Sequence, residues 1–176
     1  GLVQLVTEAT DCHACFVYLR HGDRLRMRAA SAIYGHLVGR IEMGLDEGFT
    51  GWVARHRKPA FIREDALSDP RFKYVPELAE EKFQSLLSAP IVGRDGAAIG
   101  VVTLHTEAPR EFTEAEVDFL VSSASLMEGS GFGVQVSARR RWTMGRGYRL
   151  QSTVAVRRLS SIVYRYNRGL TCAVLY

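Results

Sequence analysis

Two neighbouring apolar segments, Ser85–Val92 and Ala98–Thr106, constrain the fold of this chain more than any other feature. The residues between them include Asp95-Gly96, a pair that supplies the positive φ angles of a tight hairpin turn. Both segments carry apolar side chains on both faces of the expected strand. The sequence therefore predicts a β-hairpin at the centre of a sheet that is covered on both sides.

One face of this sheet is expected to be covered by the helix that follows the hairpin. Thr113 and Glu116 form the pattern of a capping box, in which each side chain binds the backbone N–H of the other residue. An apolar stripe at helical spacing follows: Val117, Leu120, Val121, Ala124 and Met127. The opposite face has only the irregular residues 31–84 to cover it. We expect a cavity there, and concave, mostly apolar cavities are the usual ligand sites of proteins.

The remaining segments complete an α+β fold with a central antiparallel sheet. Residues 2–9 have apolar side chains at helical spacing. Residues 13–19 and 24–30 are predicted to form a hairpin, whose second strand alternates apolar and basic side chains. A short helix is predicted over residues 49–57 and a short strand over residues 60–62. The predicted domain is residues 1–130.

The last part of the chain differs sharply in charge from the rest. Residues 131–176 contain nine arginines and no acidic residue, whereas residues 1–130 carry a net charge of −5. The first part therefore gives no electrostatic reason to expect nucleic-acid binding. The tail has several interpretations: a nucleic-acid arm, an anchor at a membrane surface, a non-native sequence from out-of-frame translation, or ordered strands. The argument for a nucleic-acid arm is that the arginines could contact phosphates and that aromatic residues could stack on bases: Trp142, Tyr148, Tyr164 and Tyr166.

The cysteines and the hydropathy pattern indicate the cellular compartment of the protein. Cys12 and Cys15 have CxxC spacing, but no second pair of ligands follows, so we expect two small core residues and no metal or redox site. No apolar run approaches the length of a membrane helix and no signal-peptide pattern begins the chain, which predicts a cytoplasmic protein. The first residue is Gly1, which suggests a piece of a longer protein.

Several segments together resemble a GAF domain. They are Gly44-Leu-Asp-Glu-Gly-Phe-Thr-Gly-Trp-Val-Ala, Lys58-Pro-Ala-Phe, Asp69-Pro-Arg-Phe-Lys-Tyr, Phe83-Gln-Ser-Leu-Leu-Ser-Ala-Pro-Ile, Ile99-Gly-Val-Val-Thr-Leu-His and Arg110-Glu-Phe-Thr-Glu-Ala-Glu-Val. The resemblance is strongest to GAF domains of nitrogen-branch phosphotransferase enzyme I, bacterial transcriptional regulators and sensor kinases. It implies a loop-lined pocket on one face of the sheet and a module that senses small molecules or dimerises.

Specialised members of that family can be compared residue by residue. The Asn-Lys-Phe-Asp-Glu motif of cyclic-nucleotide-binding members is absent from residues 73–83. Bilin-binding members and free-methionine-sulfoxide reductases use pocket cysteines, but none lies between Cys15 and Cys172. A haem-binding member would need an axial histidine, for which His36 and His105 are the candidates. The sequence identifies no cofactor.

For a generic pocket, the resemblance directs attention to aromatic residues that would enclose a ligand and to polar residues that would orient it. The candidates are Trp52, Phe72, Tyr74, Phe83, Ser85 and His105, with Asp69 and Arg71 at the rim. Each also has a structural interpretation, as a core residue, a turn former or an ordinary strand residue.

The function predicted from these residues is a regulatory domain of a bacterial signalling or transcription-control protein. Binding of an unidentified metabolite would rearrange the terminal helices and act on an output domain outside this chain. We expect a homodimer formed through the terminal helices, and nucleic-acid binding only through the arginine-rich tail. The alternative is a dimerisation module that binds no ligand. An enzyme is the least supported class, because no G-x-S-x-G motif, phosphate loop or metal-ligand spacing is present.

Overall fold

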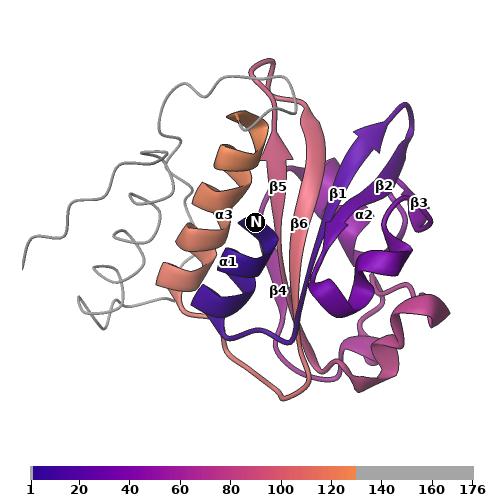
Figure 1. Ribbon diagram of the computed structural model, residues 1–176, viewed down its shortest axis with the longest axis vertical. Helices are drawn as coiled ribbons and strands as arrows, with labels where there is room; N and C mark the ends of the chain where they lie inside the picture. The colour runs from indigo at the N-terminus through magenta and orange to yellow at the C-terminus, as the bar shows by residue number, and fades with distance from the viewer. Residues whose placement is uncertain (1, 130–176) are drawn as a thin grey trace, which may run out of the picture. The chain divides into compact units, whose positions relative to one another are not determined.

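The structure is a computed structural model and describes residues 2–129. Six strands form one antiparallel sheet in the order β3-β2-β1-β6-β5-β4 (Figure 1). The strands are β1 (Ala14–His21), β2 (Arg24–Ala30), β3 (Glu42–Gly44), β4 (Ala60–Ile62), β5 (Ser85–Val92) and β6 (Ala98–Thr106). The predicted α+β fold with a central antiparallel sheet is confirmed.

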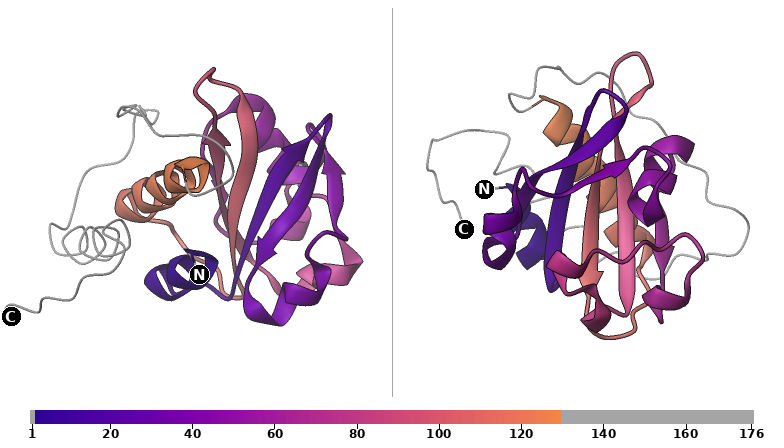
Figure 2. Two further views of the ribbon diagram at one scale, coloured as in Figure 1. Left: turned by 45° about the horizontal axis from the view of Figure 1, so that its top comes forward. Right: turned by 90° about the vertical axis from the view of Figure 1, so that its right-hand side faces the viewer.

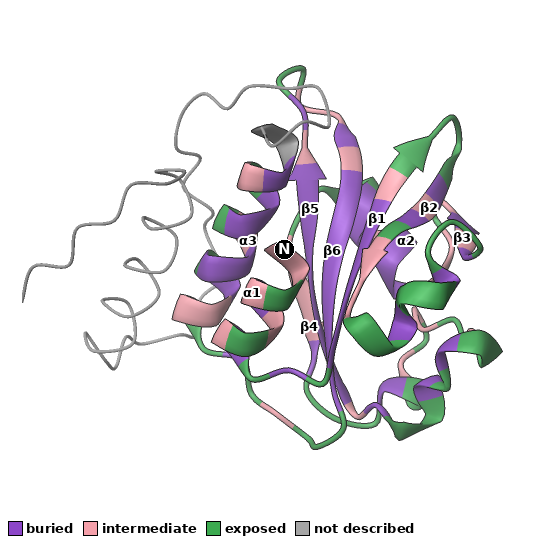
Figure 3. Ribbon diagram, in the orientation of Figure 1, coloured by how far each residue is buried: buried purple, intermediate pink, exposed green. Residues whose placement is uncertain are grey.

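The hairpin β5–β6 lies inside the sheet, between β4 and β1, and nearly all of its residues are buried, as predicted (Figure 3). Gly96 has a φ of 81° at the turn, which explains the glycine there. A Cβ on Gly100 would lie 2.4 Å from the carbonyl oxygen of Tyr18, so the close pairing of β6 with β1 requires glycine at this position.

Two helices cover one face of the sheet, which we call the helix-covered face. They are α1 (Leu2–Thr10) and α3 (Glu114–Gly129), which contact each other and lie side by side in the left-hand view of Figure 2. The predicted capping box is confirmed, because the backbone N–H of Thr113 donates to Glu116 at 2.8 Å and the N–H of Glu116 donates to the Thr113 hydroxyl at 3.3 Å. The stripe behind it faces the sheet, with Val121 partly buried and Val117, Leu120, Ala124 and Met127 buried.

The opposite face, which we call the loop-covered face, is covered by α2 (Gly48–His56) and by short 3-10 turns (Figure 2). The turns are η1 (Ala32–Leu37), η2 (Ala66–Ser68), η3 (Pro76–Leu78) and η4 (Glu80–Lys82). Residues 31–84 are thus more ordered than predicted, and β3 was missed because three residues are too few to show a period. Where the sequence predicted a cavity, side chains of the sheet, η1 and α2 pack into one buried hydrophobic cluster that includes Phe16, Leu25, Met27, Leu37, Phe49 and Val53.

None of the helices within residues 2–129 is long and apolar enough to cross a membrane. The predictions for residues 131–176, including the nucleic-acid arm, lie outside the described residues.

Candidate functional site

The side chain of His105, on β6, is buried at the loop-covered face. Its ring packs edge-on against Phe16 of β1 and against Phe83, with centroids 5.0 and 4.9 Å away. Burial lowers the pKa of His105 to about 3, so the imidazole is neutral near pH 7. Its Nδ1 atom has no hydrogen-bond partner.

Tyr34, on η1, presents a second unpaired polar atom to the same part of the core. Its ring packs edge-on against Phe16 with centroids 5.0 Å apart, and its buried hydroxyl makes no hydrogen bond. An unpaired buried polar group costs about 1–3 kcal/mol of stability. The two side chains that carry unsatisfied polar atoms, Tyr34 and His105, therefore both pack against the ring of Phe16.

A cation lies over these aromatic residues. Lys82 Nζ is 5.6 Å from the centroid of the Tyr34 ring and 5.1 Å from that of Phe83, and it pairs with Glu107 at 3.3 Å. The nearby Tyr34 hydroxyl and then Glu107 raise the pKa of Lys82, although no well-formed hydrogen bond joins Tyr34 to it. We call the group of Phe16, Tyr34, Lys82, Phe83 and His105 the central site.

A buried carboxyl group lies in the 3-10 segment just before the lysine. Glu80 is 5% exposed and accepts a hydrogen bond from the backbone N–H of Val75 at 2.7 Å. Burial raises its pKa to about 7, against the opposing effect of that hydrogen bond. Glu80 also contributes, after burial, to the raised pKa of Tyr18. This carboxyl group changes charge near physiological pH.

Three of the predicted site residues, Trp52, Asp69 and Arg71, meet elsewhere, at α2. Arg71 donates to both carboxylate oxygens of Asp69, at 2.9 and 2.7 Å, and these hydrogen bonds are the main reason that the pKa of Asp69 is lowered. The same guanidinium lies over the rings of Phe49 and Trp52, at 4.9 and 5.1 Å from their centroids. This arrangement, the Asp69–Arg71 clip, fastens the loop to α2.

Ser85 and His105 lie on opposite faces of the sheet. His105 pairs across β5 and β6 with Leu86, which belongs to the hydrophobic cluster of the loop-covered face. Ser85 is one residue earlier than Leu86, and adjacent residues of a strand point to opposite faces. The structure therefore does not bring Ser85 and His105 to one ligand.

The hydroxyl of Ser85 is fully used in holding loops together. It binds the carbonyl oxygens of Arg63 and Ala108, the latter at 3.1 Å, and accepts from the backbone N–H of Arg110 at 2.7 Å. Of the other predicted residues, Phe72 is partly buried against the hydrophobic cluster. Tyr74 is 45% exposed and donates to Glu81 at 2.8 Å.

Sequence reasoning found Phe83 and His105 of the central site and missed Phe16, Tyr34 and Lys82. Phe16 belongs to a predicted strand with nothing to distinguish it from a core residue. Tyr34 lies in a segment without periodicity, and Lys82 stands in a run of charged residues. Only the fold brings these residues together.

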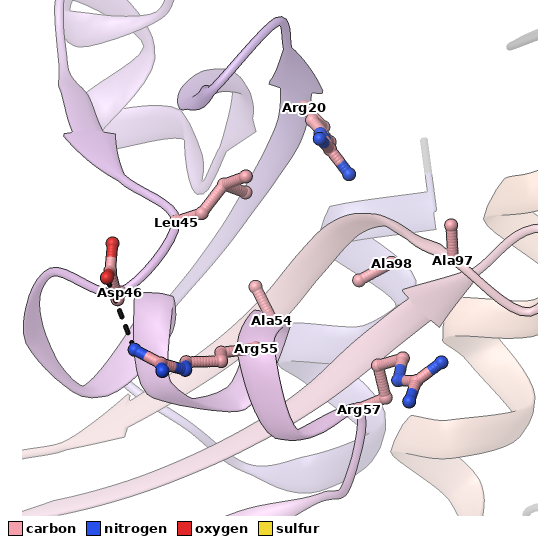
Figure 4. Close-up of a pocket in the computed structure, with 8 residues that line it drawn as sticks. All are labelled: Arg20, Leu45, Asp46, Ala54, Arg55, Arg57, Ala97 and Ala98. Atoms are coloured by element: carbon pink, nitrogen blue, oxygen red, sulfur yellow. Dashed lines mark hydrogen bonds and ion pairs between the residues drawn. The ribbon is translucent and has the colours of Figure 1, made fainter.

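A concave region lies on the surface at the end of α2 (Figure 4). Its volume is about 480 Å³, and it is lined by Arg20, Leu45, Asp46, Ala54, Arg55, Arg57, Ala97 and Ala98. No sequence motif indicated this region, because its lining comes from β1, the loop before α2, α2 itself and the start of β6.

Cys12 and Cys15 are both buried and both free, as expected for core residues. Burial raises the pKa of each thiol. Within residues 2–129, no group of histidine, cysteine and acidic side chains has the arrangement of a metal site.

Comparison with known proteins gives consistent matches. The family described as "GAF domain" matches residues 1–128. A phosphoenolpyruvate-dependent phosphotransferase system protein of Salmonella typhimurium is 32% identical over 139 residues, which cover 78% of this chain and 18% of that protein. The chain thus spans less than a fifth of that relative.

Solved structures agree with this match. The GAF domain of a phosphoenolpyruvate-protein phosphotransferase from Coxiella burnetii is 26% identical, with a TM-score of 0.66, over 72% of this chain and 75% of that one. A free methionine-R-sulfoxide reductase from Thermoplasma acidophilum is 19% identical, with a TM-score of 0.60, over 71% of this chain and 83% of that one. The second likeness concerns the fold alone, and it means that the fold occurs in enzymes as well as in regulatory domains.

Proposed function

From the premise that this chain belongs to the GAF domain family, we propose that it is a small-molecule-sensing regulatory domain without catalytic activity of its own. It acts in the cytoplasm of a bacterium, within a larger signalling protein that carries the output domain. The ligand binds at the central site. The observation that carries this proposal is that the two side chains with unpaired buried atoms, Tyr34 (Oη) and His105 (Nδ1), both pack against the ring of Phe16.

The chemistry of the central site favours a small polar metabolite. A neutral imidazole and a phenol each offer a directed hydrogen bond, while Phe16 and Phe83 supply apolar contacts. Lys82 adds a positive charge over the rings of Tyr34 and Phe83. A ligand that forms hydrogen bonds with Tyr34 Oη and His105 Nδ1 removes the free-energy penalty of leaving these atoms unpaired in the free protein. Because only the conformation that binds the ligand gains this stabilisation, binding can shift a conformational equilibrium.

The site is also connected to both terminal helices. The carbonyl oxygen of His105 accepts the backbone N–H of His13, which follows α1, at 3.0 Å. Glu107, which pairs with Lys82, donates its backbone N–H to the His13 imidazole at 3.2 Å, and the chain then continues toward α3. We propose that a ligand held between Lys82 and His105 moves these contacts and so changes the packing of α1 and α3 on the sheet. A homodimer formed through these helices would transmit the change.

A thermal-shift screen of the full 176-residue chain against amino acids, 2-oxoglutarate and cyclic nucleotides tests the proposal. A ligand at 100 times its Kd adds about 2.7 kcal/mol of stability, a shift of several degrees in Tm. The substitution Tyr34→Phe removes one hydrogen bond to the ligand, so it should weaken binding by up to about tenfold and cut the added stability to about 1.4 kcal/mol, roughly half. It should also leave the free protein as stable as the wild type or stabilise it by up to about 1 kcal/mol, because it removes an unpaired hydroxyl.

Ser85→Ala is the matched control, because it also removes a buried hydroxyl, but on the other face of the sheet. It should destabilise the free protein by about 1–3 kcal/mol, since the hydroxyl of Ser85 is fully paired, and should keep the ligand-induced shift. A ligand whose Tm shift is unchanged in Tyr34→Phe binds elsewhere, and this result would overturn the proposed site.

The second candidate function is a dimerisation module without a ligand. It is favoured by the buried hydrophobic cluster that occupies the loop-covered face. In that case no compound shifts Tm, Tyr34→Phe leaves signalling by the parent protein intact, and sedimentation velocity shows a dimer that dissociates when the exposed surfaces of α1 and α3 are made charged.

A further inference from the structure

The surface cavity at the end of α2 combines an apolar floor with a basic rim. Small apolar side chains from three elements line its base: Leu45, Ala54, Ala97 and Ala98. Arg20 comes from β1, and Arg55 and Arg57 come from the last turn of α2 and the residue that follows it (Figure 4). The one acidic residue of the lining is Asp46, so the lining carries a net charge of +2.

Each arginine is held in place by a single nitrogen. Arg20 Nε donates to the carbonyl oxygen of Gly22 at 2.8 Å, and Arg57 donates through one terminal nitrogen to the carbonyl oxygen of Gly96 at 3.2 Å. Arg55 uses one terminal nitrogen on Asp46, at 3.3 Å. A guanidinium has five N–H donors in a fixed plane, so each of the three keeps donors that have no partner among residues 2–129.

We propose that this cavity binds a small ligand that carries a phosphate or carboxylate group on an apolar body. Guanidinium groups are the preferred partners of both anions, because two parallel N–H groups match two oxygens. Arg20 and Arg57, which have no acidic partner within residues 2–129, bind the anion, while Leu45 and the three alanines receive the apolar part. The volume of about 480 Å³ falls in the range of about 300–1,000 Å³ usual for small-molecule sites.

The location of this cavity makes it a second ligand site, separate from the central site. None of the residues that line the cavity belongs to the central site, and Ala54, which lines it, packs in the hydrophobic cluster beside Phe49 and Val53 of the same helix. Arg57 also joins the end of α2 to the turn between β5 and β6 through Gly96. An anion bound by Arg57 therefore acts on the position of α2 without touching the central site, and the proposal stands whether or not the central site binds a ligand.

The test is an NMR titration of the full ¹⁵N-labelled chain with phenyl phosphate, using amide shifts to locate binding. We expect saturable shifts at the amides of Asp46, Arg57, Ala97 and Ala98, with a Kd of about 1 mM or tighter. Arg20→Gln and Arg57→Gln should each weaken binding at these amides by about tenfold, the loss expected for one charge-assisted hydrogen bond. A parallel titration with benzoate shows whether the cavity prefers a carboxylate or a phosphate. The proposal is supported whichever of the two compounds binds more tightly.

Arg28→Gln is the matched control, because Arg28 is exposed, lies outside the lining and makes the same change in net charge. It should change the Kd by less than about twofold. Phenol, which has the apolar body without the anion, should not shift the four amides. Three results would overturn the proposal: no shift at these amides up to about 10 mM phenyl phosphate, equal shifts with phenol, or equal weakening by Arg28→Gln, which would indicate attraction by net charge alone.

Discussion

The two faces of the central sheet differ in how completely their polar groups are satisfied. On the helix-covered face, the hydroxyl of Ser85 has three backbone partners, and Thr106 donates to the carbonyl oxygen of Ala108 at 3.0 Å. On the loop-covered face, Tyr34 Oη and His105 Nδ1 have no partner, and Glu80 is buried with a raised pKa. Buried polar groups are paired in most native structures, and exceptions call for an explanation.

The difference indicates that the face covered by helices and the face covered by 3-10 turns have different roles in this domain. A helix presents an apolar stripe to the sheet and pairs its own backbone N–H and C=O groups. Within the described residues, α1 and α3 therefore bring no unpaired buried side-chain nitrogen or oxygen to the sheet. The 3-10 turns that cover the other face bring isolated polar side chains into the core from short segments. The helix-covered face therefore stabilises the fold, and the loop-covered face retains unfulfilled hydrogen-bonding capacity. Three predictions test this division.

The largest expected effect comes from removing one leucine from each face. Leu104 and Leu86 are neighbours in the central hairpin and are both buried, but Leu104 points to the helix-covered face and Leu86 to the loop-covered face. Leucine-to-alanine changes in a core cost about 2–5 kcal/mol, and the cost is lower where the surroundings can collapse into the cavity. We expect Leu104→Ala to fall near the top of this range and Leu86→Ala near the bottom, as measured by urea denaturation. Equal costs would mean that the turns pack as rigidly as the helices.

The structural features that could be predicted from the sequence are those formed by residues close together in the chain. The capping box of Thr113 and Glu116 and the hairpin around Asp95-Gly96 are complete within a few residues, so their patterns identified them. Tyr34 and His105 are far apart in the chain, and nothing in either segment indicates that both would contact Phe16. The basic cavity was missed for the same reason, since Arg20 and Arg57 appear in the sequence as unrelated residues at a turn and a helix end.

Glu80 should make the stability of the loop-covered face depend on pH. Its pKa is raised from 4.5 to about 7, so the folded protein holds a proton that the unfolded chain has already lost. Stability from this group is therefore fully present below about pH 4.5 and is lost as the pH rises through about 7. Glu80→Gln keeps an oxygen for the N–H of Val75 and removes the titration. Its stability relative to the wild type should rise by about 2–3 kcal/mol between about pH 4.5 and pH 8, measured by urea denaturation at each pH.

His105 supplies a control of opposite sign. Because its pKa is lowered from 6.5 to about 3, the unfolded chain takes up a proton that the buried imidazole refuses, and stability from this group is lost as the pH falls below about 6.5. His105→Phe should flatten this acid limb and leave in place the loss of stability with rising pH that is attributed to Glu80. If Glu80→Gln and the wild type keep parallel pH profiles, the carboxyl group is hydrated in solution and the loop-covered face is more open than the structure indicates.

The smallest expected change in stability comes from a substitution in the Asp69–Arg71 clip. This substitution tests whether Arg71 stabilises the loop or belongs to the rim of a ligand site. Arg71→Lys keeps the charge but loses the two parallel hydrogen bonds to Asp69 and the planar contact with Phe49 and Trp52. Because the side chain of Arg71 is 31% exposed, solvent screens the pair and the loss should be only about 1 kcal/mol by urea denaturation. Arg40→Lys, at an exposed position, should change stability by less than about 0.5 kcal/mol. A clip predicts that Arg71→Lys loses stability and keeps the ligand-induced Tm shift. A rim contact predicts the reverse, and that result would extend the ligand site from the central site across α2.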